Sequence, residues 1–195
     1  MKKKTGSMGL LAAAMLASGA ISAQDNTWVE WATQKAGLDT ALAFNVFVAD
    51  INNDHYPDMV TLRGGWGASA PNTLKAYINV RDTSSSDPSA RMFVDITETS
   101  GVNSPSPGKT ESKGVLVAAL ADVNNDGNID LVRGAYYHAD AAAGPGERAE
   151  VLLGDGAGKF TVVPGNGLHE LGVINVTGMS FLDYDKDGNI DLFIA

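Results

Sequence analysis

Acidic and amide side chains recur at a fixed spacing in three nine-residue windows of this 195-residue sequence. The windows are Asp50–Asp58 (DINNDHYPD), Asp122–Asp130 (DVNNDGNID) and Asp183–Asp191 (DYDKDGNID), and their starts lie 72 and 61 residues apart. Oxygen-bearing side chains occupy positions 1, 3, 5 and 9 of every window. They are Asp50, Asn52, Asp54 and Asp58 in the first, Asp122, Asn124, Asp126 and Asp130 in the second, and Asp183, Asp185, Asp187 and Asp191 in the third.

This spacing predicts calcium sites. Ca²⁺ takes about six to eight oxygen ligands from carboxylates, amides, backbone carbonyls and water. Glycine at position 6, as in Gly127 and Gly188, allows a sharp turn, and the backbone carbonyl of position 7 (Tyr56, Asn128 or Asn189) would add a ligand. The windows hold 10 of the 23 acidic residues in 27 positions, and without a cation their charges would repel one another. We therefore expect up to three calcium sites.

Two other interpretations of the windows compete with calcium binding. Asp, Asn and Gly also form turns without a metal, and a single window would leave both interpretations open. Three copies at equivalent places favour calcium. An EF-hand requires a bidentate Glu at loop position 12, where this chain has Thr61, Arg133 and Ile194, so this motif is excluded.

The first window departs from the other two. His55 replaces the glycine at position 6, and Pro57 stands at position 8. A residue with a side chain must then adopt the left-handed conformation of the turn, at a modest cost. We expect the loop that begins at Asp50 to bind calcium most weakly, and the third loop, with four carboxylates, to bind it most tightly.

Short apolar segments flank each window and predict the strands that position it. The preceding segments are Phe44–Val48, Val115–Leu120 and Met179–Leu182, and the following ones are Met59–Val60, Leu131–Val132 and Leu192–Ile194. A third strand is expected at Leu74–Val80 and Glu150–Leu153, and a fourth at Met92–Thr97 and Lys159–Val163. The windows are then hairpin-like connections between the first and second strands.

Four strands per unit of about sixty residues predict an all-β fold, a β-propeller built from four-stranded antiparallel blades. We expect blades at 44–98 and 115–163, a partial blade at 177–195, and an outer strand at 28–39 that aligns with the fourth strand of the first blade. About two and a half blades cannot close a propeller, so the sequence looks like the N-terminal fragment of a longer chain. Its open blade faces would favour self-association.

The N-terminus has the pattern of a secretory signal peptide. Lys2–Lys4 form a basic start, Gly9–Ala20 is an apolar run too short to span a bilayer, and small residues precede a cleavage site near Ala23. We expect residues 1–23 to be removed, residues 24–195 to form the propeller region, and the protein to be secreted, periplasmic or on the cell surface, without a transmembrane segment.

Composition excludes several classes of partner and site. The formal net charge is −9, and it becomes −12 when the three lysines of residues 1–23 are removed, so nucleic acid is a poor partner. The chain has no cysteine, which excludes disulfides, thiolate zinc sites and a cysteine nucleophile. His55, His138 and His169 match no zinc signature, and we expect no catalytic residue and no organic cofactor in this chain.

The order of apolar strand, DxNxDGxxD window, apolar strand and a segment such as Val151–Phe160 (VLLGDGAGKF) resembles the FG-GAP or VCBS repeat. The resemblance covers roughly residues 28–195 and is residue by residue in the second and third windows. It implies an integrin-α-like, calcium-binding propeller of about seven blades with a role in adhesion or in binding an extracellular protein or carbohydrate. The alternative is the scaffold or substrate-binding part of a secreted enzyme, such as a polysaccharide lyase or hydrolase, whose catalytic residues lie outside this chain. A third interpretation is a nonfunctional gene fragment.

Overall fold

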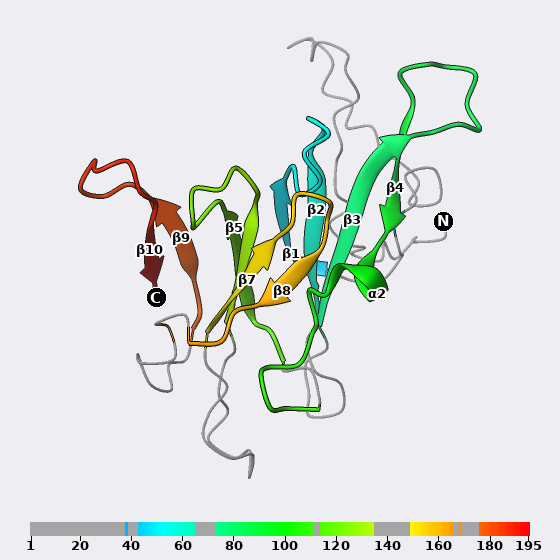
Figure 1. Ribbon diagram of the computed structural model, residues 1–195. Helices are drawn as coiled ribbons and strands as arrows, with labels where there is room; N and C mark the ends of the chain where they lie inside the picture. The colour runs from blue at the N-terminus through cyan, green and yellow to red at the C-terminus, as the bar shows by residue number, and fades with distance from the viewer. Residues whose placement is uncertain are drawn as a thin grey trace, which may run out of the picture.

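Antiparallel pairing between consecutive strands organises the chain into two four-stranded sheets and a hairpin (Figure 1). The computed structural model describes residues 38, 43–64, 73–110, 114–134, 149–165, 168 and 176–195. The first sheet contains β1 (Ala43–Ala49), β2 (Asp58–Arg63), β3 (Thr73–Arg81) and β4 (Arg91–Asp95). The second contains β5 (Val117–Ala121), β6 (Asp130–Gly134), β7 (Glu150–Gly154) and β8 (Phe160–Val162). The hairpin is β9 (Met179–Leu182) with β10 (Asp191–Ile194).

The strand order in each sheet follows the sequence, β1-β2-β3-β4 and β5-β6-β7-β8. This is the four-stranded antiparallel arrangement of a propeller blade, and the all-β fold class expected from the sequence is confirmed. The acidic windows are the connections β1–β2, β5–β6 and β9–β10, as the flanking apolar segments predicted. The expected signal peptide at 1–23 and, except for Leu38, the expected outer strand at 28–39 lie outside the described residues.

The fourth strand of the first sheet is shorter than the sequence predicted. It ends at Asp95, and α2 (Thr97–Ser100) is a single helical turn where a strand was expected to reach Thr97. The Thr97 hydroxyl accepts a hydrogen bond from the Ala76 N–H at 3.0 Å, and the Thr97 N–H donates to Asp95 Oδ1 at 2.9 Å. Side-chain hydrogen bonds of this kind compete with strand pairing and turn the backbone away from the sheet.

The main apolar core lies between the two four-stranded sheets. Buried residues of both sheets form one cluster, and Val102, which follows the helical turn, is fully buried in it. Leu168 occupies a similar place in the cluster around Val117 and Val176, which joins the second sheet to the β9–β10 hairpin. β1 contacts β5, and β5 contacts β9, so the first strands of consecutive units adjoin. The units therefore pack side by side, and their three acidic loops lie at the same end (Figure 1).

A buried ion pair connects this core to the segment after α2. Arg133 and Glu150 are 0% and 1% exposed, and their Nη2 and Oε2 atoms are 2.8 Å apart. The Arg133 guanidinium also donates to the backbone carbonyls of Val102 at 2.8 Å and Ser104 at 2.6 Å. Arg133 thus holds the chain that leaves the first sheet against the second sheet.

Among the described residues, no helix is long and apolar enough to cross a membrane.

Removing only one member of this pair should be costly. We expect Arg133→Met to lower the free energy of unfolding by about 3 kcal/mol, because it leaves the Glu150 carboxylate buried without its cation. The double variant Arg133→Met with Glu150→Leu should recover most of this loss, since no buried charge remains. Urea denaturation of the single and double variants measures both values, and equal stability of the two variants would contradict the assignment.

Candidate metal centre

The three acidic loops share one internal hydrogen-bond pattern, and we call residues 50–58, 122–130 and 183–191 the first, second and third loops. In each loop the backbone N–H of position 5 donates to the side-chain oxygens of positions 1 and 3, at 3.0–3.1 Å. The N–H of position 6 donates to the other carboxylate oxygen of position 1, at 2.8–3.1 Å. The N–H of position 7 donates to position 5, at 2.7–2.9 Å. These bonds curl the backbone so that alternate side chains gather.

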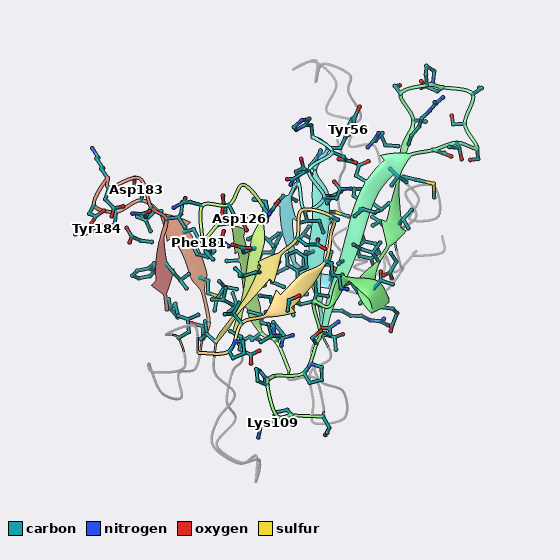
Figure 2. All side chains as sticks on the ribbon, viewed as in Figure 1. Tyr56, Lys109, Asp126, Phe181, Asp183 and Tyr184 are labelled. Carbon is teal, nitrogen blue, oxygen red and sulfur yellow. The ribbon has the colours of Figure 1, made fainter. Side chains whose placement is uncertain are left out.

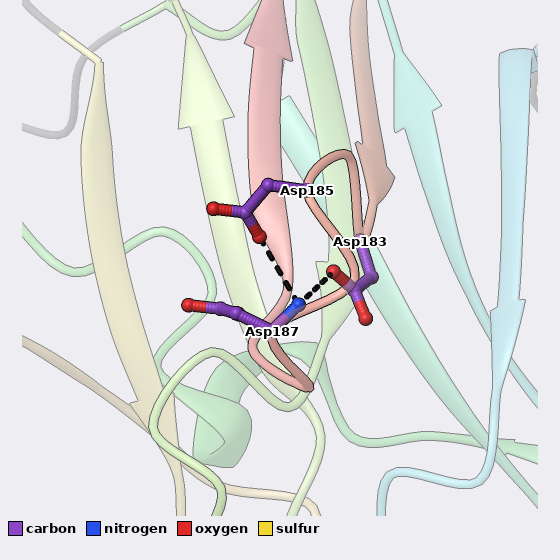
Figure 3. Close-up of side chains that lie close together, drawn as sticks. All are labelled: Asp183, Asp185 and Asp187. Carbon is purple, nitrogen blue, oxygen red and sulfur yellow. Dashed lines mark hydrogen bonds between the residues drawn. The ribbon is translucent and has the colours of Figure 1, made fainter.

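The third loop brings three carboxylates together at positions 1, 3 and 5. Figure 3 shows the N–H of Asp187 donating to both Asp183 and Asp185. One oxygen from each of these three carboxylates lies within 4.8 Å of the others, and all three side chains are exposed to solvent. Figure 2 places Tyr56, Asp126 and Asp183, one residue from each loop, along the same end of the molecule, with Lys109 at the opposite end. All three loops are therefore open to ions from solvent on one face.

The turn in each loop needs two residues with positive φ, and sequence reasoning identified only one of them. Position 6 was expected to be left-handed, and His55, Gly127 and Gly188 have φ of 66°, 87° and 89°. Position 4 is left-handed as well. Its residues are Asn53, Asn125 and Lys186, with φ of 58°, 59° and 62°. Asn tolerates this conformation better than most residues, so the repeated Asn-Asn pair in the first two loops was the available signal.

Position 9 anchors each loop to its sheet. The Oδ2 of Asp58 accepts the Ile51 N–H at 2.9 Å, and the Oδ2 of Asp130 accepts the Val123 N–H at 2.9 Å. Their Oδ1 atoms accept N–H groups from the third strands, those of Asn79 at 2.7 Å and Gly154 at 2.8 Å. Both aspartates are fully buried. Asp191 makes the equivalent bond to the Tyr184 N–H at 2.8 Å but is exposed.

Burial and hydrogen bonding shift the pKa values of the carboxylates within one loop in opposite directions. Burial raises the pKa of Asp58 and of Asp130, and the nearby carboxylates of positions 5 and 1 raise it further. Hydrogen bonds, first from the backbone N–H of position 7, lower the pKa of Asp126 and of Asp187. A raised folded-state pKa favours folding at low pH, and that contribution is lost as the pH rises through the folded-state value. A cation in the loop would oppose this loss by favouring the ionised form.

Amide side chains connect one loop to the next. Asn53 Nδ2 donates to Asn128 Oδ1 at 2.8 Å, which joins position 4 of the first loop to position 7 of the second. Asn125 Nδ2 donates to Asn189 Oδ1 at 3.0 Å in the same way. The β7–β8 turn packs beside the first of these bonds, and its Gly158 N–H donates to the Ile51 carbonyl at 2.9 Å. Neighbouring loops are thus in direct contact.

All fifteen residues predicted as ligands lie in these loops. The side-chain oxygens of positions 1, 3 and 5 converge in each loop. The carboxylate of position 9 accepts hydrogen bonds from backbone N–H groups, and the N–H of position 7 closes the turn. The donors that converge are oxygens, and the residues present fit a hard divalent cation such as calcium. The His55 side chain is 96% exposed, and its Nδ1 lies 3.9 Å from Asp50 Oδ2. His138 and His169 lie outside the described residues.

Substitution of position 9 and of position 5 should separate structural from ligand roles. Asp130→Asn replaces an acceptor of a buried backbone N–H by a second donor, so we expect about 2 kcal/mol of destabilisation even in the presence of a chelator. Asp126→Asn changes an exposed side chain and should cost under about 0.5 kcal/mol under the same conditions. Urea unfolding in chelator compares the two variants, and similar losses would disprove this division.

Gly156 should be intolerant of a side chain. Its φ is +70°, and a Cβ would stand against Asn128 Oδ1 and Asn53 Nδ2, the two atoms that join the first and second loops. We expect Gly156→Ala to lower the free energy of unfolding by about 2 kcal/mol, from backbone strain together with the lost hydrogen bond. Gly165→Ala is the matched control, because Gly165 has the same φ with open space around it. Equal losses in the two variants would show that strain alone matters.

Comparison with known families gives a match for part of the chain, and no curated protein matches it. Residues 122–194 match the model of the FG-GAP-like repeat. The matched residues run from the second acidic loop through the second sheet to the third loop and β10, whereas the first loop, with its His55 and Pro57, lies outside them. The match includes three of the four strands of the second sheet, β6, β7 and β8, and the first sheet repeats the strand order of the second with a loop of the same geometry. The chain therefore contains an FG-GAP-like repeat at residues 122–194.

Proposed function

We propose that the chain is an exported β-propeller module that binds calcium in its three acidic loops and recognises an extracellular protein or carbohydrate without catalysing a reaction. The calcium has a structural role. The observation that carries the proposal is the common arrangement of the loops, in which oxygens of positions 1, 3 and 5 converge in every copy. Asp183, Asp185 and Asp187 bring three carboxylate oxygens within 4.8 Å of one another.

The negative charge of the loops favours a bound cation over a simple turn without a metal. A turn needs one acceptor for each backbone N–H, but the third loop carries four carboxylates on an exposed connection. The hydrogen-bond donors to these carboxylates are backbone N–H groups and the Asn189 amide, all of them uncharged. Backbone N–H groups satisfy oxygen lone pairs without adding net positive charge. Like charges so close together raise the free energy of the folded loop unless a cation neutralises them. A divalent ion bound there would supply that neutralisation.

Such an ion would act on the arrangement of the sheets. Each loop joins the first two strands of a unit, and its position 9 residue fixes the start of the second strand. The first and second loops are also bonded to each other through Asn53 and Asn128, and the second and third through Asn125 and Asn189. Holding the loops closed would therefore stabilise both the hairpins and the contact between neighbouring blades.

Export is supported by the sequence. Lys2–Lys4 followed by the apolar Gly9–Ala20 run and the small residues before Ala23 is typical of a cleaved signal peptide. A chain without cysteine that functions outside the cell cannot use disulfides, and bound calcium provides another means of stabilisation. The loop-bearing end, where all three acidic loops are open to solvent, is the surface we assign to ligand recognition.

Calcium should raise the thermal stability of the protein measurably. At about 100 times the dissociation constant, one site adds roughly 2.7 kcal/mol, so a chelator should lower the melting temperature by about 5–10 °C. Asp187→Asn should weaken binding to the third loop about tenfold or more in calorimetry and reduce the chelator effect. Asp87→Asn is the control, because Asp87 also accepts a backbone N–H in an exposed turn but lies outside the three loops.

Three results would refute the proposed function. They are a melting temperature that does not change with chelator, the absence of heat on calcium titration of the full chain, and equal effects of Asp87→Asn and Asp187→Asn. Magnesium serves as a further comparison, because it dehydrates reluctantly and prefers octahedral sites, and should therefore raise the melting temperature less than calcium does.

A further inference from the structure

The first loop has a positively charged neighbour with no counterpart at the matching position of the second blade. Arg91, on β4, places its guanidinium carbon 3.4 Å from the ring centroid of Tyr56, the position 7 residue. Its Nη2 lies 3.9 Å from Oδ2 of Asp54, the position 5 residue. The Arg91 side chain is 27% exposed and that of Asp54 37%, so solvent screens their attraction only in part.

Asn79 holds this guanidinium in place. Arg91 Nε donates to Asn79 Oδ1 at 3.0 Å, and Arg91 Nη2 donates to the Asn79 carbonyl at 2.7 Å. Asn79 in turn donates from Nδ2 to the Pro57 carbonyl at 3.1 Å and from its backbone N–H to Asp58 Oδ1 at 2.7 Å. Positions 5, 7, 8 and 9 of the first loop are therefore connected to one arginine, directly or through Asn79.

The second blade has glycines at the same two places. Gly154 donates its N–H to Asp130 as Asn79 does to Asp58, and it pairs with Phe160 as Asn79 pairs with Phe93. Gly158 stands two residues before Phe160, and Arg91 stands two residues before Phe93. A Cβ at Gly154 would collide with the carbonyl of Ile129, the position 8 residue, so the second blade has no room for a side chain like that of Asn79.

Because the second loop forms the same hydrogen-bond pattern without such an arginine, the backbone of the first loop does not depend on Arg91 for its shape. What the arginine changes is the charge. A guanidinium beside two expected ligand positions offsets part of the negative charge that would attract a divalent ion, and it would repel that ion once bound. Even at the dielectric constant of bulk water, one such charge about 6 Å from a divalent ion is worth roughly tenfold in affinity.

We propose that Arg91 acts as a permanent positive charge beside the first loop and makes this loop the low-affinity calcium site of the protein. When calcium is scarce, the guanidinium partly neutralises the negative charge of the carboxylates in the loop. The inference rests on the proposed calcium binding. It assigns the weakness of the first loop to a residue on another strand, in addition to His55 and Pro57 within the loop.

Site-resolved calcium titration of the ¹⁵N-labelled full chain tests the proposal. The position 6 amides of His55, Gly127 and Gly188 each donate to position 1 of their own loop and report on it separately. In the wild type, the His55 resonance should respond at higher calcium than the other two. Arg91→Gln should move the His55 midpoint about tenfold lower and leave the Gly127 and Gly188 midpoints unchanged. Arg91→Lys, which keeps the charge, should leave the His55 midpoint within about threefold of the wild type.

Arg81→Gln is the matched control, since Arg81 pairs with Arg91 across β3 and β4, is exposed, and carries the same charge. It should shift none of the three midpoints. Arg91→Met keeps an unbranched chain beside Tyr56 and provides a second neutral variant in case the glutamine variant is poorly folded, as judged from the Gly127 and Gly188 resonances in calcium. It should give the same shift.

The outcomes distinguish the two proposals. If none of the three amides responds to calcium, the proposed calcium binding is wrong and the role of Arg91 is wrong with it. If Gly127 and Gly188 respond but the His55 midpoint is unchanged or higher in both neutral variants, calcium binding stands and the role of Arg91 is refuted. A shift of equal size in Arg81→Gln would also refute it, because net charge alone would then explain the effect.

Discussion

Crowding of negative charge in exposed loops is the constraint on which the rest of this structure depends. Each loop collects carboxylates and amides at one point because backbone N–H groups bond to them in sequence. These bonds fix the position of the oxygens but leave their charge almost unchanged. The second strand of each unit begins at the position 9 aspartate, and in the two four-stranded sheets that side chain is buried. The crowded carboxylates and the start of the second strand therefore belong to one structural unit.

The position of the loops and the type of fold could be predicted from the sequence because they depend on short-range patterns. The apolar segments beside Asp50, Asp122 and Asp183 predicted the strands, and the alternation of oxygen-bearing residues predicted which side chains gather. Boundaries were less accurate where side chains compete with the backbone. At Thr97 the hydroxyl takes an N–H from β3, so the chain turns into a helical turn rather than continuing β4.

The features that could not be predicted join residues far apart in the sequence. Arg133 and Glu150 form a buried ion pair 17 residues apart, and Asn53 bonds to Asn128 across 75 residues. No periodic pattern in the sequence predicts such contacts. Arg91 is typical, since in the sequence it follows a Ser-rich loop and has no motif of its own. Its importance for the first loop follows from the register of β3 and β4, which brings it beside Asn79 and Tyr56.

The Gly158 to Ile51 bond crosses the boundary between two sequence repeats. A turn of the second blade completes the surroundings of a loop that belongs to the first blade, and Gly156 beside it leaves space for the Asn53 and Asn128 side chains. Stability in such an array depends on nearest-neighbour interfaces as well as on individual units. A single repeat excised at its sequence boundaries would lack the contacts that the next blade makes with its loop. A piece that keeps all the contacts of the first loop must therefore include parts of two consecutive repeats.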